Sequence, residues 1–185
     1  MNAVLSPNSA ADCAHRLPPR SLRAPTDVET ANRLFGANCG PVTFAALLSL
    51  QTCDVMQFFS HFETRKFTTC RDMMQALKAC GIEFAIGADY PEFGFALIQI
   101  EGPWTQSRKA ARWSDKYTHW VGVCGRRIYD INAAAWMPAH EWEAQFVSAL
   151  IAATPGATGW SVKRSVQVPA QAFFAEQAVP GLCFS

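Results

Sequence analysis

Apolar residues recur at helical spacing through the first half of the chain. This spacing predicts helices that carry one apolar face each. The expected elements are a short helix or turn over 28–37, a helix from Cys39 to about Ser49, a short helical segment over 55–62 and a helix over 68–82. Thr69 can cap the last of these, and Gly81 ends it.

The second half of the chain changes to short runs with β character, separated by turn residues. We expect a strand within 83–88, a strand over about 95–100, a polar loop over 103–117, a hairpin within 118–136, a helix over 138–154 and a last strand over 160–168. Because helices come first and mostly antiparallel strands follow, the order predicts an α+β fold.

Residues 1–27 are rich in Ser, Pro, Ala and Arg and lack a hydrophobic period, which is typical of a mobile, disordered arm. The remaining residues, 28–185, form a single expected domain, since 185 residues suffice for one core. The apolar C-terminal segment over 172–185 is expected to pack against this domain at a place that the pattern does not specify.

Charge and cysteine spacing narrow the classes of partner and compartment. The formal net charge is only +1, which gives no electrostatic reason to expect nucleic acid or an anionic membrane. Seven cysteines include no CxxC pair, so we expect no metal, and no other cofactor is expected. A chain of this length with a large core also argues against a disulfide framework. Reduced thiols and the lack of a secretory pattern at the N-terminus predict a reducing, cytoplasmic setting; the Ser/Pro/Arg-bearing arm leaves open export as an effector without a Sec-type signal.

Cys39 stands at the entrance of a predicted helix, within "ANCGPVTFAALLSL", where a capping Ser, Thr or Asp is more usual. Taken alone, such a cysteine is more often a packing residue. However, the partial positive charge of a helix N-terminus stabilises a thiolate, which makes a nucleophile. Choosing between the two interpretations requires a base elsewhere in the chain.

The base is expected at His119, the one histidine that opens a strand beside an apolar run. If Gly125-Arg126 is the hairpin turn, paired residue numbers sum to 251, and His119 lies opposite Asn132. Asp130 then projects to the same face as His119. A three-residue turn would shift the register and send the carboxylate to the other face.

Cys39, His119 and Asp130 therefore satisfy what nucleophilic catalysis demands: a nucleophile, a base and a group that orients the base. Asn132 is the alternative third member. Each residue alone favours a structural interpretation, but the coincidence of all three on suitable faces favours a catalytic triad.

The motifs "NCGPVTFAALL", "HWVGV" and "YDIN" resemble those of the papain-like cysteine peptidases, and most closely the compact bacterial C39-like branch. The resemblance covers about residues 30–135. It implies a helical lobe that carries Cys39 as nucleophile and an antiparallel β-sheet lobe that carries His119 as base and Asp130 as third member. Substrate would lie between the lobes.

The sequence departs from this family at the position of the oxyanion-hole glutamine, six residues before the cysteine, where it has Arg33. Asn32 and Asn38 are the candidate replacements, together with the backbone N–H of Cys39. Loss of one oxyanion donor typically lowers the rate by about a hundredfold or more.

The resemblance implies a cysteine protease that hydrolyses a peptide or isopeptide bond through a thioester acyl-enzyme, with a protein or peptide as its substrate. Two alternatives stay open: acyl transfer of the transglutaminase or deamidase type with the same triad, and a papain-like module that binds without turnover. Transfer to an added amine distinguishes the first, and a Cys39 no more reactive than the other six thiols would indicate the second.

Overall fold

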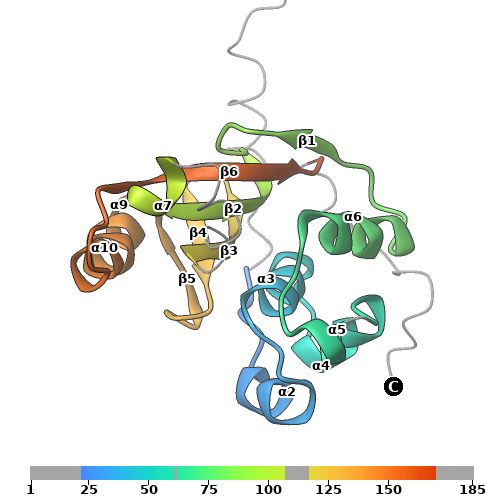
Figure 1. Ribbon diagram of the computed structural model, residues 1–185. Helices are drawn as coiled ribbons and strands as arrows, with labels where there is room; N and C mark the ends of the chain where they lie inside the picture. The colour runs from blue at the N-terminus through green and yellow to red at the C-terminus, as the bar shows by residue number, and fades with distance from the viewer. Residues whose placement is uncertain (1–21, 61, 107–116, 170–185) are drawn as a thin grey trace, which may run out of the picture.

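The computed structural model describes residues 22–60, 62–106 and 117–169. Its first half is helical, and most of the helices lie together on one side of the molecule (Figure 1). They are α2 (Val28–Phe35), α3 (Cys39–Leu48), α4 (Thr52–Val55), η1 (Met56–Phe58), α5 (Phe62–Arg65) and α6 (Cys70–Ala79). The second half supplies most of a six-stranded antiparallel sheet, so the α+β class expected from the sequence is confirmed.

Helix α3 is the centre of the helical half because nearly all of its side chains are apolar and buried. Its N-cap is Asn38, whose side-chain oxygen accepts a hydrogen bond from the backbone N–H of Gly40 at 3.4 Å. The stacked rings of Phe44 and Phe95, 5.8 Å apart, join α3 to the sheet. Helix α6 begins with the expected Thr69 cap, which forms a capping box with Asp72.

The sheet has the order β1-β6-β2-β3-β4-β5. Its strands are β1 (Ala85–Gly87), β2 (Phe93–Glu101), β3 (Thr118–Cys124), β4 (Arg127–Asp130), β5 (Ala135–Pro138) and β6 (Gly159–Gln167). Each strand is antiparallel to its neighbours, and the last strand in sequence lies next to the first two in space.

The β3–β4 hairpin has the register predicted from its turn. Cys124 lies opposite Arg127 and Gly122 opposite Tyr129, so paired numbers sum to 251. The ladder stops at Gly122, because β4 ends at Asp130 and the chain turns through 131–134 into β5. The first residues of β3 therefore extend beyond the β4 ladder, and the pairing of His119 with Asn132 expected from the register is not part of it.

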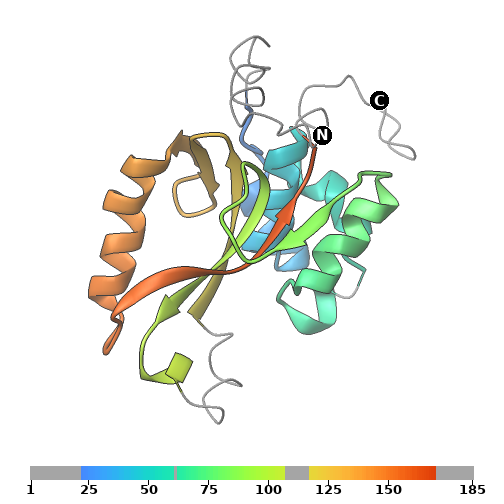
Figure 2. The same ribbon diagram turned by 90° about the horizontal axis from the view of Figure 1, so that it is seen from above.

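Two cores lie on opposite faces of the sheet. The larger one joins α3 and its neighbouring helices to side chains such as Trp120, Tyr129 and Val166. The smaller one packs Val121, Val123 and Ile128 under the helical segment formed by α9 (Ala139–Trp142), the π-helix η3 (Glu143–Val147) and α10 (Ser148–Ala153). Figure 2 shows this segment and the α3 side flanking the strands.

Three features differ from the sequence-based expectation. Residues 103–106, expected within a polar loop, form the short helix α7 (Pro103–Gln106), while 107–116 lie outside the described residues. Strand β5 was not expected as a separate strand. The segment 22–27, assigned to the arm, contacts the core: the Asp27 carboxylate accepts backbone N–H groups at the start of α4 at 2.7 and 2.8 Å.

The rest of the expected arm, 1–21, and the C-terminal residues 170–185 lie outside the described residues. Within the described ranges, no single helix has the length and apolar composition to cross a membrane; α3 and the 52–58 segment meet that test only as a pair bent by 104°.

Candidate active site

Cys39 is the first residue of α3 and is half-buried where the helix meets β3. The contact depends on the open end of the β3–β4 ladder. There the Thr43 hydroxyl of α3 donates to the backbone oxygen of Trp120 at 3.2 Å, and the backbone N–H of Trp120 donates to the sulfur of Cys39. Helix α3 thus takes the place of a neighbouring strand and sets the sulfur against the start of β3.

His119, the residue before Trp120, connects this sulfur to the carboxylate of Asp130. Its Nε2 atom lies 2.9 Å from Oδ1 of Asp130, and because a carboxylate only accepts, Nε2 carries the proton and donates. The ring also interacts with the Cys39 thiol, through a hydrogen bond and through charge. The structure therefore brings together the three side chains that the sequence singles out.

Asp130 is buried and its two oxygens are held by three donors. Oδ1 accepts a hydrogen bond from the His119 ring and another from the backbone N–H of Asn132 at 2.8 Å. Oδ2 accepts a hydrogen bond from the indole N–H of Trp142 at 2.8 Å. Burial by itself raises the pKa of this carboxyl, but its hydrogen bonds and the charge of His119 outweigh that effect and lower the pKa. Asp130 is therefore ionised and fixed in orientation.

The Cys39–His119 pair is poised for ionisation. Burial raises the pKa of the Cys39 thiol, but the hydrogen bond and charge of His119 more than reverse this, and the net effect is a lowered pKa. Burial lowers the pKa of His119, whereas Asp130 and Cys39 raise it by a larger amount. Opposite shifts of this kind favour a thiolate next to an imidazolium.

The other described thiols shift in the opposite direction. Burial raises the pKa of Cys53, Cys80 and Cys124 to about 11, and it also raises the pKa of Cys70. Cys39 is thus the one thiol of the described residues whose pKa is lowered. A nucleophile at Cys39 is distinguished by its partner, and not by exposure alone.

A groove of about 640 Å³ opens beside Cys39. The segment leading into α6 forms one wall, and strands β2, β3 and β6 form the other; Leu97 and Trp120 contribute apolar surface. A cavity of this volume is within the range that holds a small ligand or a few peptide residues. The Cys39 side chain is among the residues that line it.

The oxyanion candidates lie in different settings. Asn38 borders the groove, but its side-chain amide donates to the backbone oxygen of Lys66 at 2.8 Å, and its oxygen caps α3. Asn32 lies on the exposed face of α2, and Arg33 beside it is also exposed. The Cys39 N–H, first in its helix, has no acceptor within that helix. An oxyanion role for either asparagine stays a prediction.

Asn132, the alternative third member, contributes a backbone N–H to Asp130 and lies exposed at the turn, while Asp130 makes the direct contact with the imidazole.

Trp142 is a site residue that sequence reasoning missed. It is 2% exposed and lies at the end of α9, directly before the π-helix η3. Its ring meets that of Trp160 edge-on, with centroids 5.6 Å apart. The only sequence signal was a tryptophan on an amphipathic helix following the hairpin, which is also typical of a core residue.

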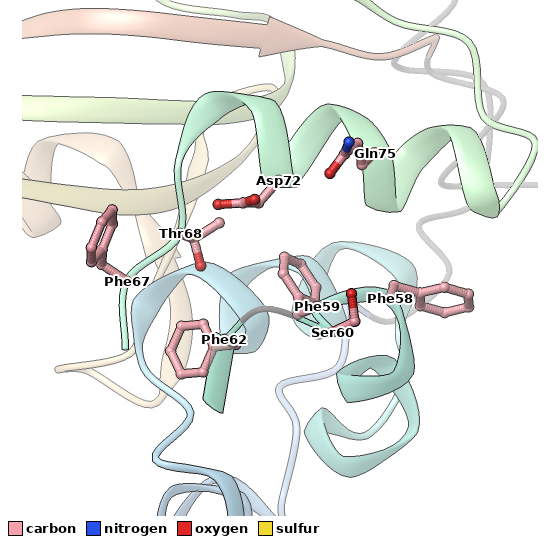
Figure 3. A pocket seen from close by; sticks show the side chains of 8 residues that line it. All are labelled: Phe58, Phe59, Ser60, Phe62, Phe67, Thr68, Asp72 and Gln75. Atoms are coloured by element: carbon pink, nitrogen blue, oxygen red, sulfur yellow. The ribbon is translucent and has the colours of Figure 1, made fainter. Parts of the chain in front are cut away.

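A second cavity, of about 20 Å³, lies between α6 and the η1–α5 region (Figure 3). Four phenylalanines and four polar residues line it, and it holds none of the three triad side chains. Its volume corresponds to about one water molecule. We therefore regard it as a packing gap.

Among the described residues, no group of three or more His, Cys, Asp or Glu side chains is arranged to hold a metal ion. Comparisons with protein-family models, curated proteins and solved structures find no match to this chain.

Proposed function

We propose that this protein is a cysteine peptidase that hydrolyses a peptide or isopeptide bond with Cys39 as nucleophile, His119 as general acid and base, and Asp130 as the orienting group. The observation that supports this most strongly is the 2.9 Å contact from His119 Nε2 to Asp130, together with the interaction of the same imidazole with the Cys39 thiol. We also propose that its arrangement is papain-like, since one helix carries the thiol and a neighbouring sheet carries the imidazole.

In the proposed reaction, the Cys39 thiolate attacks the carbonyl carbon of the scissile amide and forms a tetrahedral oxyanion. The imidazolium of His119 transfers its proton to the leaving amine, and the C–N bond breaks to give a thioester. Neutral His119 then takes a proton from water, whose oxygen attacks the thioester carbon. The C–S bond breaks, which releases the acid and restores the thiolate–imidazolium pair.

Asp130 supports both halves of the reaction. Its bond to Nε2 leaves Nδ1 as the nitrogen available to exchange a proton with the sulfur and the reacting atoms. Its negative charge stabilises the imidazolium before and after each proton transfer. The N-terminus of α3 favours the thiolate, and the Cys39 N–H, which has no acceptor within its helix, can donate to the oxyanion.

The test is alkylation by iodoacetamide between pH 4 and 10, followed by site-specific mass spectrometry of each cysteine. Because His119 lowers the pKa of Cys39, we expect this thiol to react well below the ordinary thiol pKa of about 8.5, whereas the other four described cysteines react only at higher pH. His119→Ala should move the Cys39 profile to higher pH.

Cys39→Ala is the control and should abolish cleavage of a peptide library without unfolding the protein. A wild-type Cys39 that titrates like the other thiols would overturn the proposal. Incubation of the reacting enzyme with an added amine then measures transfer against hydrolysis.

A further inference from the structure

Two consecutive residues of β6, Lys163 and Arg164, both line the groove beside Cys39. Neighbouring residues of a regular strand point to opposite faces of a sheet, so this placement needs an explanation. The register supplies it: Leu97 pairs with Arg164, but Ile98 pairs with Val162, and Lys163 is the extra residue of a β-bulge.

The bulge reverses the face of the sheet on which alternate β6 side chains lie, so residues before and after it pack into different cores. Before it, Trp160 and Val162 pack into the smaller core under α9–α10. After it, Val166 belongs to the larger core on the α3 side. At the switch, Lys163 and Arg164 are both directed to the α3 side, where α6 contacts β6. Bulges recur beside active sites because they redirect side chains in this way.

The groove consequently has a positive charge. Its lining contains two cations and neither Asp nor Glu among the described residues. Arg164 is exposed, and no acidic side chain of the described ranges forms an ion pair with it. Lys163 adds a second positive charge but makes an interaction of its own, so Arg164 is the better candidate for binding an anion.

We infer that this groove selects peptides that carry an acidic side chain within a few residues of the scissile bond, with Arg164 as the residue that recognises the carboxylate. This inference rests on the proposed function, because it takes Cys39 as the reacting group. A guanidinium suits this role, since its planar fork can donate two hydrogen bonds to one carboxylate. Apolar surface from Leu97 and Trp120 would accept the side chain next to the acidic one.

Irreversible labelling with epoxysuccinyl diamide peptides, extended on both sides of the reactive group, provides the test. Glu is placed at each of three positions on either side and compared with Gln at the same position. In the wild type we expect Glu to raise the second-order rate of Cys39 labelling by about three- to tenfold at one or two positions. The ratio of the labelling rate with Glu to that with Gln should fall close to one in Arg164→Gln and in Lys163→Gln/Arg164→Gln.

Arg164→Glu should reverse the effect, so that Lys at the same peptide position is preferred over Glu. Lys78→Gln/Arg126→Gln removes two exposed cations outside the groove and should leave the Glu preference unchanged. Equal rates for Glu and Gln at every position, or a preference that persists in the double variant, would overturn the inference.

Iodoacetamide, which is small and uncharged, separates this failure from failure of the proposed function. If Cys39 reacts at low pH in every groove variant but shows no Glu preference, only the inference is wrong. If wild-type Cys39 is not activated towards iodoacetamide, the proposed function fails and the inference fails with it.

Discussion

Asp130 accepts three hydrogen bonds, and each donor fixes a different part of the site. The His119 ring and the Asn132 N–H share Oδ1, so Trp142 is the donor that holds Oδ2. Without that donor the carboxylate is freer to rotate about its Cβ–Cγ bond, and the imidazole loses its fixed orientation. In the proposed reaction Trp142 is therefore a positioning residue, since it would act through Asp130.

Trp142→Phe keeps an aromatic ring in the core and removes the indole N–H. Because the bond from Trp142 lowers the pKa of Asp130, its loss should raise that pKa, and the acidic limb of the Cys39 alkylation profile should move to higher pH. Alkylation near neutral pH should fall about three- to tenfold, as expected for a lost hydrogen bond to a charged group. Iodoacetamide kinetics between pH 3 and 8 measure both effects.

Trp160→Phe is the matched control. Its indole N–H donates to Glu143 at 3.2 Å near the surface, and its ring packs against Trp142. It should lower the melting temperature slightly and leave the pH profile in place. Equal profiles for Trp142→Phe and the wild type would refute a positioning role for Trp142.

At the scale of elements, Gly40 explains why the helix that carries Cys39 begins as it does. A Cβ atom at residue 40 would lie 2.0 Å from Oγ1 and 2.3 Å from Cβ of Thr68. Glycine therefore permits the first turn of α3 to approach the segment before α6, and this approach forms part of the groove wall beside the sulfur.

Gly40→Ala should force α3 away from Thr68, at a cost of about 1–3 kcal/mol in unfolding free energy, as is typical of overpacking. Because the shift also moves Cys39 relative to His119, alkylation at pH 6 should slow. Gly159→Ala is the control, since a Cβ atom added at residue 159 would meet nothing within 4 Å. Urea unfolding and iodoacetamide kinetics give the two readouts, and Gly40→Ala behaving like Gly159→Ala would contradict this account.

Local signals in the sequence were sufficient for some elements and insufficient for others. The α3 helix and the β3–β4 register followed from an apolar run and a two-residue turn, which act over a few residues. The bulge at Lys163 depends on how β6 pairs with the distant strand β2, and no residue near it signals that pairing. Trp142 escaped notice for the same reason, because its role depends on its contact with Asp130.

At the scale of the whole molecule, the site exists only because the helical half docks on the sheet. The sequence predicted that His119 and Asp130 share a face of one hairpin, and their contact confirms it. It did not specify that Cys39 reaches them at the open end of the β3–β4 ladder, since this depends on the packing of α3 against β3. The ion pair between His119 and Asp130 should therefore contribute to global stability.

The sign of its pH dependence follows from the two pKa shifts. The pKa of Asp130 is lowered, so its contribution is present above its unfolded pKa of about 3.9 and is lost as the pH falls through the folded value. The pKa of His119 is raised, so its contribution is complete below about 6.5 and is lost as the pH rises through the folded value. The pair should thus stabilise the protein most between about pH 4 and 6.5.

Comparing Cys39→Ala with Cys39→Ala/His119→Gln isolates this contribution, because both variants lack the thiol. The lowered pKa of that thiol would otherwise add stability as the pH rises, whereas the raised pKa of His119 removes it. The difference in unfolding free energy should reach about 1–2 kcal/mol near pH 5 and shrink on either side. Urea denaturation at intervals from pH 3 to 9 measures it. A difference that stays constant over this range would mean that the imidazole packs at this position without forming a charged pair. In that case no imidazolium would be present to stabilise a thiolate at Cys39.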